Sequence, residues 1–318
     1  MNQKQGSFCF QTQKRLLMLF NLIFFMGCFG IGTSLKAQDR FLLPLEGTDW
    51  SKVSPGARTD ILVQLEKTAT APEFSTLSET DQEKIITVFT QALLRDPVET
   101  IRSFSALCLA KFSTEKDNSE IIEALVQAFK YDSSTMVRKT SAAALGNYNL
   151  ADWQVSLLVL AALNPETPHL VRGGTVDGVY AISEDKKAPF LPFVSDALDT
   201  KNAHDRWWAV LTAGAFRSAG APLVHKLTSM VTSDPKEWIA VESALVLGKL
   251  GEAAVSAVPS IRDLLQRPLT NGNLKRVVHA LDDLSPFSSD AKVAAYHARW
   301  IYPDNFVNDI QNGWFRKK

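Results

Sequence analysis

The stretch Asp132–Gly146, DSSTMVRKTSAAALG, has a longer counterpart in Asp234–Gly251, DPKEWIAVESALVLGKLG. Each stretch begins at an acidic turn, continues through small and apolar residues, and ends at a glycine. An Asp side chain caps the exposed backbone N–H groups that begin a helix, and glycine is favoured just beyond a helix end. The two stretches therefore predict copies of one short helix.

Copies of this helix recur along most of the chain. Counted from Arg138, equivalent positions lie 31 to 37 residues apart, a spacing typical of two-helix repeats. The aligned positions are Arg102, Arg138, Arg172, Ala209, Ala240 and approximately Arg276. A small or short apolar residue follows each position by four, which allows stacked helices to approach closely. The pattern predicts an all-α fold, an α-solenoid of about six stacked antiparallel helix pairs.

A second helix is expected after each marked helix. The expected second helices are Glu120–Lys130, Trp153–Leu163, Ala188–Leu198, Ala221–Val231 and Val255–Gln266. Proline near a helix start needs no N–H partner, although Pro192 and Pro259 are expected to distort their helices. Arg102 and Arg138 each follow an Asp by six residues, so we expect a structural ladder of Arg–Asp pairs rather than an anion-binding site.

These motifs resemble a known family. Asp234–Gln266 resembles a HEAT-like repeat of the short type first associated with phycobilisome lyases, and Val137-Arg138 with the ending Ala143–Gly146 matches the same pattern. The resemblance covers roughly Asp81–Leu284 and implies a superhelical fold. Relatives with this fold include enzymes that attach bilins to cysteines and alkylpurine glycosylases that act on DNA. The sequence departs from the pattern at Trp207-Trp208, where Val-Arg is usual, and at three glycines expected to weaken the third marked helix: Gly173, Gly174 and Gly178.

The N-terminus predicts export. Basic residues up to Arg15 precede an apolar run, Leu16–Phe29, and a short, more polar segment follows and ends at Ala37. Residues 1–37 are therefore expected to be a signal peptide that is cleaved after Ala37. An uncleaved N-terminal anchor and a lipid on Cys28 are the alternatives. The expected location is the periplasm, the cell envelope or the outside of the cell.

The rest of the chain divides into three parts. Residues 38–80 are expected to form a lead-in and an N-terminal capping helix, residues 81–288 the HEAT-like repeat array, and residues 289–318 a C-terminal capping helix and tail. Removal of residues 1–37 leaves Cys108 as a single cysteine, which cannot form an internal disulfide. We expect its thiol to be buried and inert.

The charge balance argues against nucleic acid as a partner. The full chain carries 34 basic and 34 acidic residues, and removal of residues 1–37 leaves 30 basic and 34 acidic. A mildly acidic chain lacks the basic surface that phosphate backbones require. Contact with a membrane is expected only through the N-terminal anchor or the lipid on Cys28.

The sequence contains no catalytic motif in its required context. HExxH, CxxC, GxSxG and P-loop patterns are absent, and the five histidines are spread along the chain without metal-ligand spacing. We therefore expect a protein that is not an enzyme and that holds no cofactor and no metal.

Three tryptophans are candidate binding residues. Trp207 and Trp208 open one marked helix, and Trp238 aligns with Trp207 in the next repeat, so the three are expected near one edge of the stack. Core packing and a binding hot spot for a peptide, glycan or protein both explain them. His225, on the polar face of a second helix, is a fourth candidate. Trp153–Leu163 has almost no polar face, and burial on both sides is expected rather than an exposed apolar strip.

Together these features predict a non-enzymatic scaffold that binds a protein or peptide, whose identity the sequence does not indicate. A structural subunit of an envelope complex is the second hypothesis. A bilin-lyase-like enzyme on the same fold is the third, and the export signal argues against it.

Overall fold

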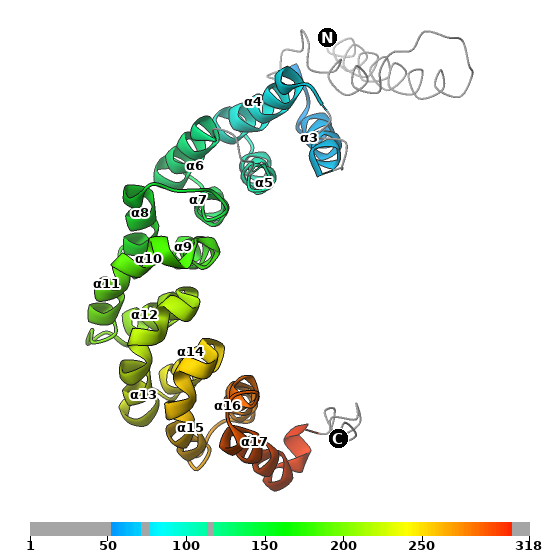
Figure 1. Cartoon of the computed structure of the whole chain (residues 1–318). Helices are drawn as coiled ribbons and strands as arrows, with labels where there is room; N and C mark the ends of the chain where they lie inside the picture. Colours follow the sequence, from blue (N-terminus) through cyan, green and yellow to red (C-terminus); the bar gives the residue numbers. More distant parts are fainter. Residues whose placement is uncertain (1–51, 71–76, 113–117, 307–318) are drawn as a thin grey trace, which may run out of the picture. The chain divides into compact units, whose positions relative to one another are not determined.

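The computed structural model describes residues 52–70, 77–112 and 118–306, which all belong to one compact unit, Asp49–Lys318. The described residues form helices and connecting turns and contain no strand (Figure 1). The predicted all-α class is confirmed for this part of the chain. The expected signal peptide at 1–37 and the alternative lipid site at Cys28 lie outside the described residues.

Two sets of helices alternate along the chain, and Figure 1 labels both. The first helices are α3 (Pro55–Thr70), α5 (Glu99–Leu109), α7 (Thr135–Leu145), α9 (His169–Ala181), α12 (Ala203–Ala215), α14 (Glu237–Leu250) and α16 (Asn271–Leu284). The second helices are α4 (Glu79–Arg95), α6 (Ser119–Tyr131), α8 (Asp152–Leu163), α11 (Leu191–Ala197), α13 (Val224–Ser233), α15 (Val258–Leu264) and α17 (Ser289–Ile301).

Short helical segments lead into three of the second helices. These segments are α10 (Glu184–Lys187) with η3 (Ala188–Phe190) before α11, η4 (Arg217–Leu223) before α13, and η5 (Gly251–Ala257) before α15, and η6 (Pro303–Phe306) follows α17. α11 and α15 begin only at Leu191 and Val258, each one residue before a proline, because proline has no N–H to continue an earlier helix. The expected distortion at Pro192 and Pro259 is confirmed.

Each helix packs mainly on its neighbours in the chain. The first helices contact one another in order, from α3 and α5 through α7, α9, α12 and α14 to α16. From α5 onward, each also packs on the second helix that precedes it, as α5 does on α4 and α14 on α13. Apolar side chains fill the space between the two sets, and they include fully buried Phe89, Leu125, Leu158, Leu227 and Ile261.

The helix starts correct the sequence alignment. The fourth residues of the first helices are Arg58, Arg102, Arg138, Arg172, Arg206, Ala240 and Leu274. From Arg138 onward these positions are 34 residues apart, as 172 − 138 and 206 − 172 show. Arg206 and Leu274 therefore replace Ala209 and Arg276 of the alignment, and Arg58 adds a position ahead of it.

The glycines of α9 do not break that helix, although the sequence predicts that they weaken it. α9 runs unbroken through Gly173, Gly174 and Gly178. A Cβ added at Gly174 would lie 2.3 Å from the carbonyl oxygen of Lys139, and one at Gly178 would lie 2.4 Å from that of Ala142. The backbones of α7 and α9 therefore touch, and glycine is the residue that permits this contact.

One run of the described residues is long and apolar enough to cross a membrane. It is Glu237–Leu264, and it consists of α14, η5 and α15, with half of its most apolar window buried inside the protein. Gly251 has a φ of 61° between α14 and η5, so the run is not one straight helix. Its apolar residues belong to the core of the fold.

Candidate functional site

Arginines of the first helices pair with a carboxylate in the turn before the next first helix. The pairs with two N–O contacts are Arg58–Asp96, Arg102–Asp132 and Arg206–Asp234. Their N–O distances lie between 2.7 and 3.2 Å. Each Asp also accepts a backbone N–H from the residue two positions later. The expected Arg–Asp pairing is confirmed at Arg102, the pairs of Arg58 and Arg206 extend it, and in each pair the partner belongs to the following repeat.

Burial and charge act together on the Arg102–Asp132 pair. Burial alone would raise the pKa of Asp132, but hydrogen bonds from Arg102 and from the Ser134 backbone N–H outweigh it and lower that pKa. The same hydrogen bond raises the pKa of Arg102. Because both groups are charged and satisfied by each other, the pair neutralises itself and leaves no free cation for an external anion.

The ladder changes at α7 and α9. The turn before α9 carries Asn164 in place of Asp, and Arg138 donates to the carbonyl oxygen of Phe129 at 3.0 Å, so the expected pairing with an Asp is not found at this position. Arg172 on α9 pairs with Asp205, which lies within α12, at 3.0 Å. The ladder is therefore structural, and a functional site has to be sought elsewhere on the described surface.

The predicted tryptophans meet in a cluster of five aromatic rings at the start of α9, α12 and α14. We call this the aromatic cluster, and it consists of His169, His204, Trp207, Trp208 and Trp238. The ring centroids of Trp207 and Trp208 are 5.0 Å apart, and those of Trp207 and Trp238 are 6.0 Å apart and nearly perpendicular. His204 lies 5.5 Å from Trp238. These separations are typical of attractive aromatic pairs.

Trp208 is the buried member of the aromatic cluster. Its side chain is 6% exposed, and its indole N–H donates to Nδ1 of His169 at 3.1 Å. The guanidinium of Arg172 lies 5.1 Å from the Trp208 ring centroid and donates to the carbonyl oxygen of Ala162 at 3.0 Å. Burial lowers the pKa of Arg172, and the hydrogen bond to Asp205 opposes that shift. Trp208 therefore joins α12 to α9 and behaves as a core residue.

The outer members of the aromatic cluster have a different environment. Trp207 and Trp238 are half-buried, and His169 and His204 are exposed. The indole rings of Trp207 and Trp238 and the two imidazoles thus reach the surface, and the buried ring of Trp208 lies beneath them.

His225 is not part of this group. It lies exposed on α13, a second helix, whereas the aromatic cluster is built from first helices. Sequence reasoning missed His169 and His204. Both could have been found from the repeat, because they occupy the first and second positions of consecutive first helices.

α8 exposes an apolar strip, and the expectation of burial on both sides was wrong. Trp153 is 58% exposed and Leu160 is 44% exposed, while Val155 and Leu158 on the opposite side are fully buried. With Lys130 of α6, the outer face lines an open groove of about 710 Å³. A helix without polar residues still has an outer side, and here no neighbouring helix covers it extensively.

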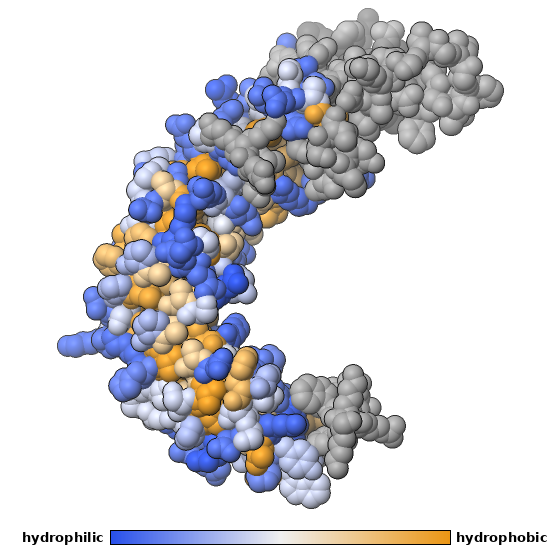
Figure 2. Space-filling model, viewed as in Figure 1, coloured by the Kyte–Doolittle hydropathy of each residue, from blue (hydrophilic) through white to orange (hydrophobic). Residues whose placement is uncertain are grey.

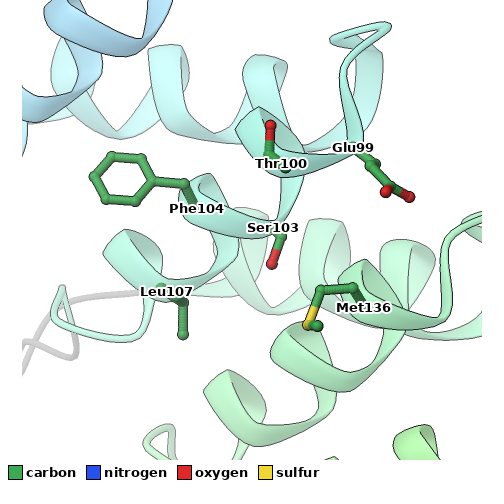
Figure 3. A pocket seen from close by; sticks show the side chains of 6 residues that line it. All are labelled: Glu99, Thr100, Ser103, Phe104, Leu107 and Met136. Carbon is green, nitrogen blue, oxygen red and sulfur yellow. The ribbon is translucent and has the colours of Figure 1, made fainter.

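A smaller depression lies between α5 and α7. It has a volume of about 190 Å³, and Figure 3 labels the residues that line it, with Phe104 and Leu107 on α5 and Met136 on α7. Glu99 is the only ionisable residue that lines it. A single carboxylate beside apolar side chains offers no acid–base pair and no nucleophile with a base, so the geometry supplies no catalytic arrangement.

Three buried titratable groups serve the core. The Nζ of Lys187 donates to the carbonyl oxygen of Ala215 at 2.8 Å and to that of Val179 at 3.3 Å, and burial lowers its pKa to about 8. Burial raises the pKa of the free thiol of Cys108 to about 12, as expected for an inert cysteine. Burial also raises the pKa of Tyr148, whose hydroxyl donates to the Leu109 carbonyl.

Among residues 52–70, 77–112 and 118–306, no group of three His, Cys, Asp or Glu side chains is placed to hold a metal ion. No family model matches the chain, and no curated protein matches it either. The resemblance to HEAT-like repeats therefore stays a prediction that rests on the residues themselves.

Proposed function

We propose that this protein is a non-enzymatic, exported scaffold that binds a protein or peptide at the aromatic cluster. Its fold in this proposal is an α-solenoid of about six helix pairs of the HEAT-like type. The order of contacts supports the solenoid, since first helices pack in succession from α3 to α16. The basic and apolar segment within residues 1–37 supports export.

The observation that carries the binding proposal is the arrangement of Trp207 and Trp238. Their rings meet edge to face on adjacent helices and are half-buried. A pair of aromatic side chains with fixed orientation and partly open faces is the usual centre of a binding hot spot. Trp208 supports them, and its substitution would disturb the fold rather than the surface alone.

The test compares two surfaces of the same full-length chain. Cross-linking of the tagged protein in its native envelope, followed by mass spectrometry, is expected to return a specific partner. The double variant Trp207→Ala/Trp238→Ala should lose that partner. The matched control is Phe193→Ala on α11, where the side chain is 50% exposed and lies outside the aromatic cluster. A partner that persists in the double variant would remove the aromatic cluster as the binding site.

A structural subunit of an envelope complex is the second candidate function. The observation that favours it is the set of exposed apolar side chains on α17, where a terminal helix is expected to be polar on its outer side. Size-exclusion chromatography of the native extract, compared with the purified protein, distinguishes the two. A subunit elutes in a larger assembly even when the aromatic cluster is changed.

A further inference from the structure

The aromatic cluster extends across three consecutive first helices. The ring centroids of His169 on α9 and His204 on α12 are 6.5 Å apart, and those of His204 and Trp238 on α14 are 5.5 Å apart. Trp207 lies beside Trp238 with its ring plane turned by 72°, so the two indoles meet at a steep angle. A ligand on this surface would cross from one repeat to the next and meet a ring on each.

The polar ring atoms of the aromatic cluster are hydrogen-bond donors. Apolar surface alone does not single the cluster out, because Figure 2 shows hydrophobic and hydrophilic side chains interspersed over the visible face of the protein. Among the residues that the structure describes, nothing accepts the indole N–H of Trp207 or Trp238, and neither nitrogen is buried. The Nδ1 of His169 accepts the Trp208 indole N–H, so a neutral His169 carries its own proton on Nε2. The aromatic cluster therefore offers three ring N–H groups to a ligand.

The backbone around the aromatic cluster adds donors rather than acceptors. The cluster lies where its helices begin, and there the exposed backbone groups are N–H donors while the carbonyl oxygens point into the helix. α9 and α14 begin without a side-chain cap. The carboxylates on the same helix turns are engaged: Asp205 accepts from Arg172, and Oε1 of Glu237 accepts from Asn273 at 2.7 Å. The surface is therefore rich in donors and poor in acceptors.

Charge does not select an ionic partner for the aromatic cluster. Exposed side chains in the turns before α9, α12 and α14 carry both signs, and they include Glu166, Lys201 and Lys236. Arg172 and Arg206, the arginines next to the rings, are each paired with an aspartate of the chain. An ion brought against the rings would lose water without gaining a buried partner of opposite charge. A neutral ligand whose polar groups are acceptors fits this surface better.

We infer that the aromatic cluster binds a proline-rich segment of its partner in the polyproline II conformation. This inference rests on the function proposed for the cluster and specifies the chemistry of the partner. Proline has no N–H, so a proline-rich segment presents carbonyl acceptors without backbone donors at its prolines. Aromatic-lined grooves recognise such segments by packing aromatic side chains against the prolines. Polyproline II rises about 3.1 Å per residue, so about two residues would pass each ring of the cluster.

Other neutral ligands match the aromatic cluster less well. An ordinary extended peptide brings an N–H with each carbonyl, and those N–H groups would find few acceptors here. A sugar brings hydroxyl donors that need acceptors in the same way. A proline-rich segment is also preformed, so holding it against the rings costs little conformational entropy.

The experiment is a titration of the full-length chain, labelled with ¹⁵N at tryptophan, with a capped decamer of proline. The indole N–H signals of Trp207 and Trp238 should shift, because each N–H gains a carbonyl acceptor. The signal of Trp208 should shift less, because its N–H already donates to His169. A capped Gly-Ser decamer, which keeps every N–H, and cellohexaose, a neutral sugar, are the matched probes. Neither should shift the signals at the same concentration.

Two substitutions at Trp238 separate the ring from its N–H. Trp238→Phe keeps an aromatic face and loses the donor, so the Kd for the proline decamer should rise about fivefold, the effect of one hydrogen bond. Trp238→Ala removes both, and the Kd should rise at least about thirtyfold. Phe193→Ala, at a side chain that is 50% exposed on α11, should leave the Kd unchanged. Calorimetry measures each Kd, and the remaining indole signals show whether each variant keeps its fold.

One result separates this inference from the function on which it rests. The proline decamer could bind no better than the Gly-Ser decamer while Trp207→Ala/Trp238→Ala still loses the native partner. The inference would then be wrong and the proposed function would stand. Cellohexaose binding that is lost in the same double variant would assign the aromatic cluster to a sugar and remove both.

Two further results would overturn the inference alone. Binding of a capped glutamate decamer that is lost in Lys236→Ala would assign the site to an acidic segment of the partner. Binding of the proline decamer that is unchanged in Trp238→Ala would place that peptide elsewhere on the chain.

Discussion

The carboxylate of Asp132 holds two partners at once: the guanidinium of Arg102 from the preceding repeat and the backbone N–H of Ser134 at the start of its own. One side chain thus joins two repeats and closes the turn before a helix. The turn before α9 has Asn164 in the same role toward the backbone, where its Oδ1 accepts the N–H of Glu166 at 3.0 Å. Asn keeps the hydrogen bond of the turn but lacks the charge, which separates the two effects.

Asp132→Asn is expected to lower the free energy of unfolding by about 2 kcal/mol at neutral pH, because the charged hydrogen bonds to Arg102 are lost and the hydrogen bond of the turn is kept. The folded-state pKa of Asp132 is below its ordinary value, so its contribution is present above pH of about 4 and is lost as pH falls through the folded pKa. Urea denaturation at neutral and acidic pH measures this, and the gap between variant and wild type should narrow in acid. Asp263→Asn, at a carboxylate that is 68% exposed, is the control and should have no measurable effect at either pH.

Gly174→Ala and Gly173→Ala should have opposite effects on thermal stability, although the residues are adjacent in α9. A Cβ at Gly174 would collide with the Lys139 backbone, and the expected cost is more than about 2 kcal/mol. A Cβ at Gly173 would have only the Trp208 ring near it, at 4.0 Å, and alanine favours the helix by about 1 kcal/mol. Scanning calorimetry of both variants gives the answer. Equal effects would contradict the contact between the α7 and α9 backbones.

Arg217→Gly is expected to stabilise the protein by up to about 1 kcal/mol. Arg217 has a φ of 55°, and the residue 34 positions later, Gly251, has a φ of 61°. The backbone therefore has a positive φ at the same point of two repeats, and only one of the two residues is glycine. The side chain of Arg217 is half exposed and lies 3.5 Å from Glu184, a contact of little value in water. The reverse change, Gly251→Ala, should destabilise. Urea midpoints of the two variants measure both shifts.

Lys187→Met should change how stability depends on alkaline pH. The pKa of Lys187 is about 8 in the folded protein and about 10.5 when unfolded. Between these values the unfolded chain binds more protons at this residue, so the wild type gains stability relative to Lys187→Met as pH rises through the interval. The raised pKa values of Cys108 and Tyr148 act in the opposite direction, but they are shared by both proteins and cancel in the difference.

The same variant should be less stable than wild type at neutral pH, because methionine cannot donate to the carbonyl oxygens of Val179 and Ala215. Paired urea titrations across the pH range give both quantities. A constant difference between wild type and variant from pH 7 to 11 would show that Lys187 does not titrate in this interval.

The helical class and the Arg–Asp ladder could be predicted because both depend on residues that lie close together in the sequence. The register of α12 was harder to predict. Arg206 follows the N-cap residue Asn202 by four residues, whereas Arg138 follows Asp132 by six. An alignment that relied on small residues therefore moved to Ala209. Only the position of the helix start fixes which residue faces the next turn.

In the candidate site, the burial of individual side chains could not be predicted from the sequence. Trp207 and Trp208 are identical in type and adjacent in sequence, yet one is half-buried and the other buried, because neighbours on a helix point about 100° apart. The outer face of α8 could not be predicted from α8 alone. Its exposure depends on whether α6 lies against it, and that distance is a property of the tertiary packing.

At the contact between α7 and α9 an ion pair of the ladder is missing and the backbones touch instead. The pairs on either side of it, Arg102–Asp132 and Arg172–Asp205, are largely buried. Dissolved salt screens buried pairs much less than exposed ones and has little effect on close van der Waals packing. The joints from α5 to α12 should therefore keep their geometry when the ionic strength of the surroundings changes.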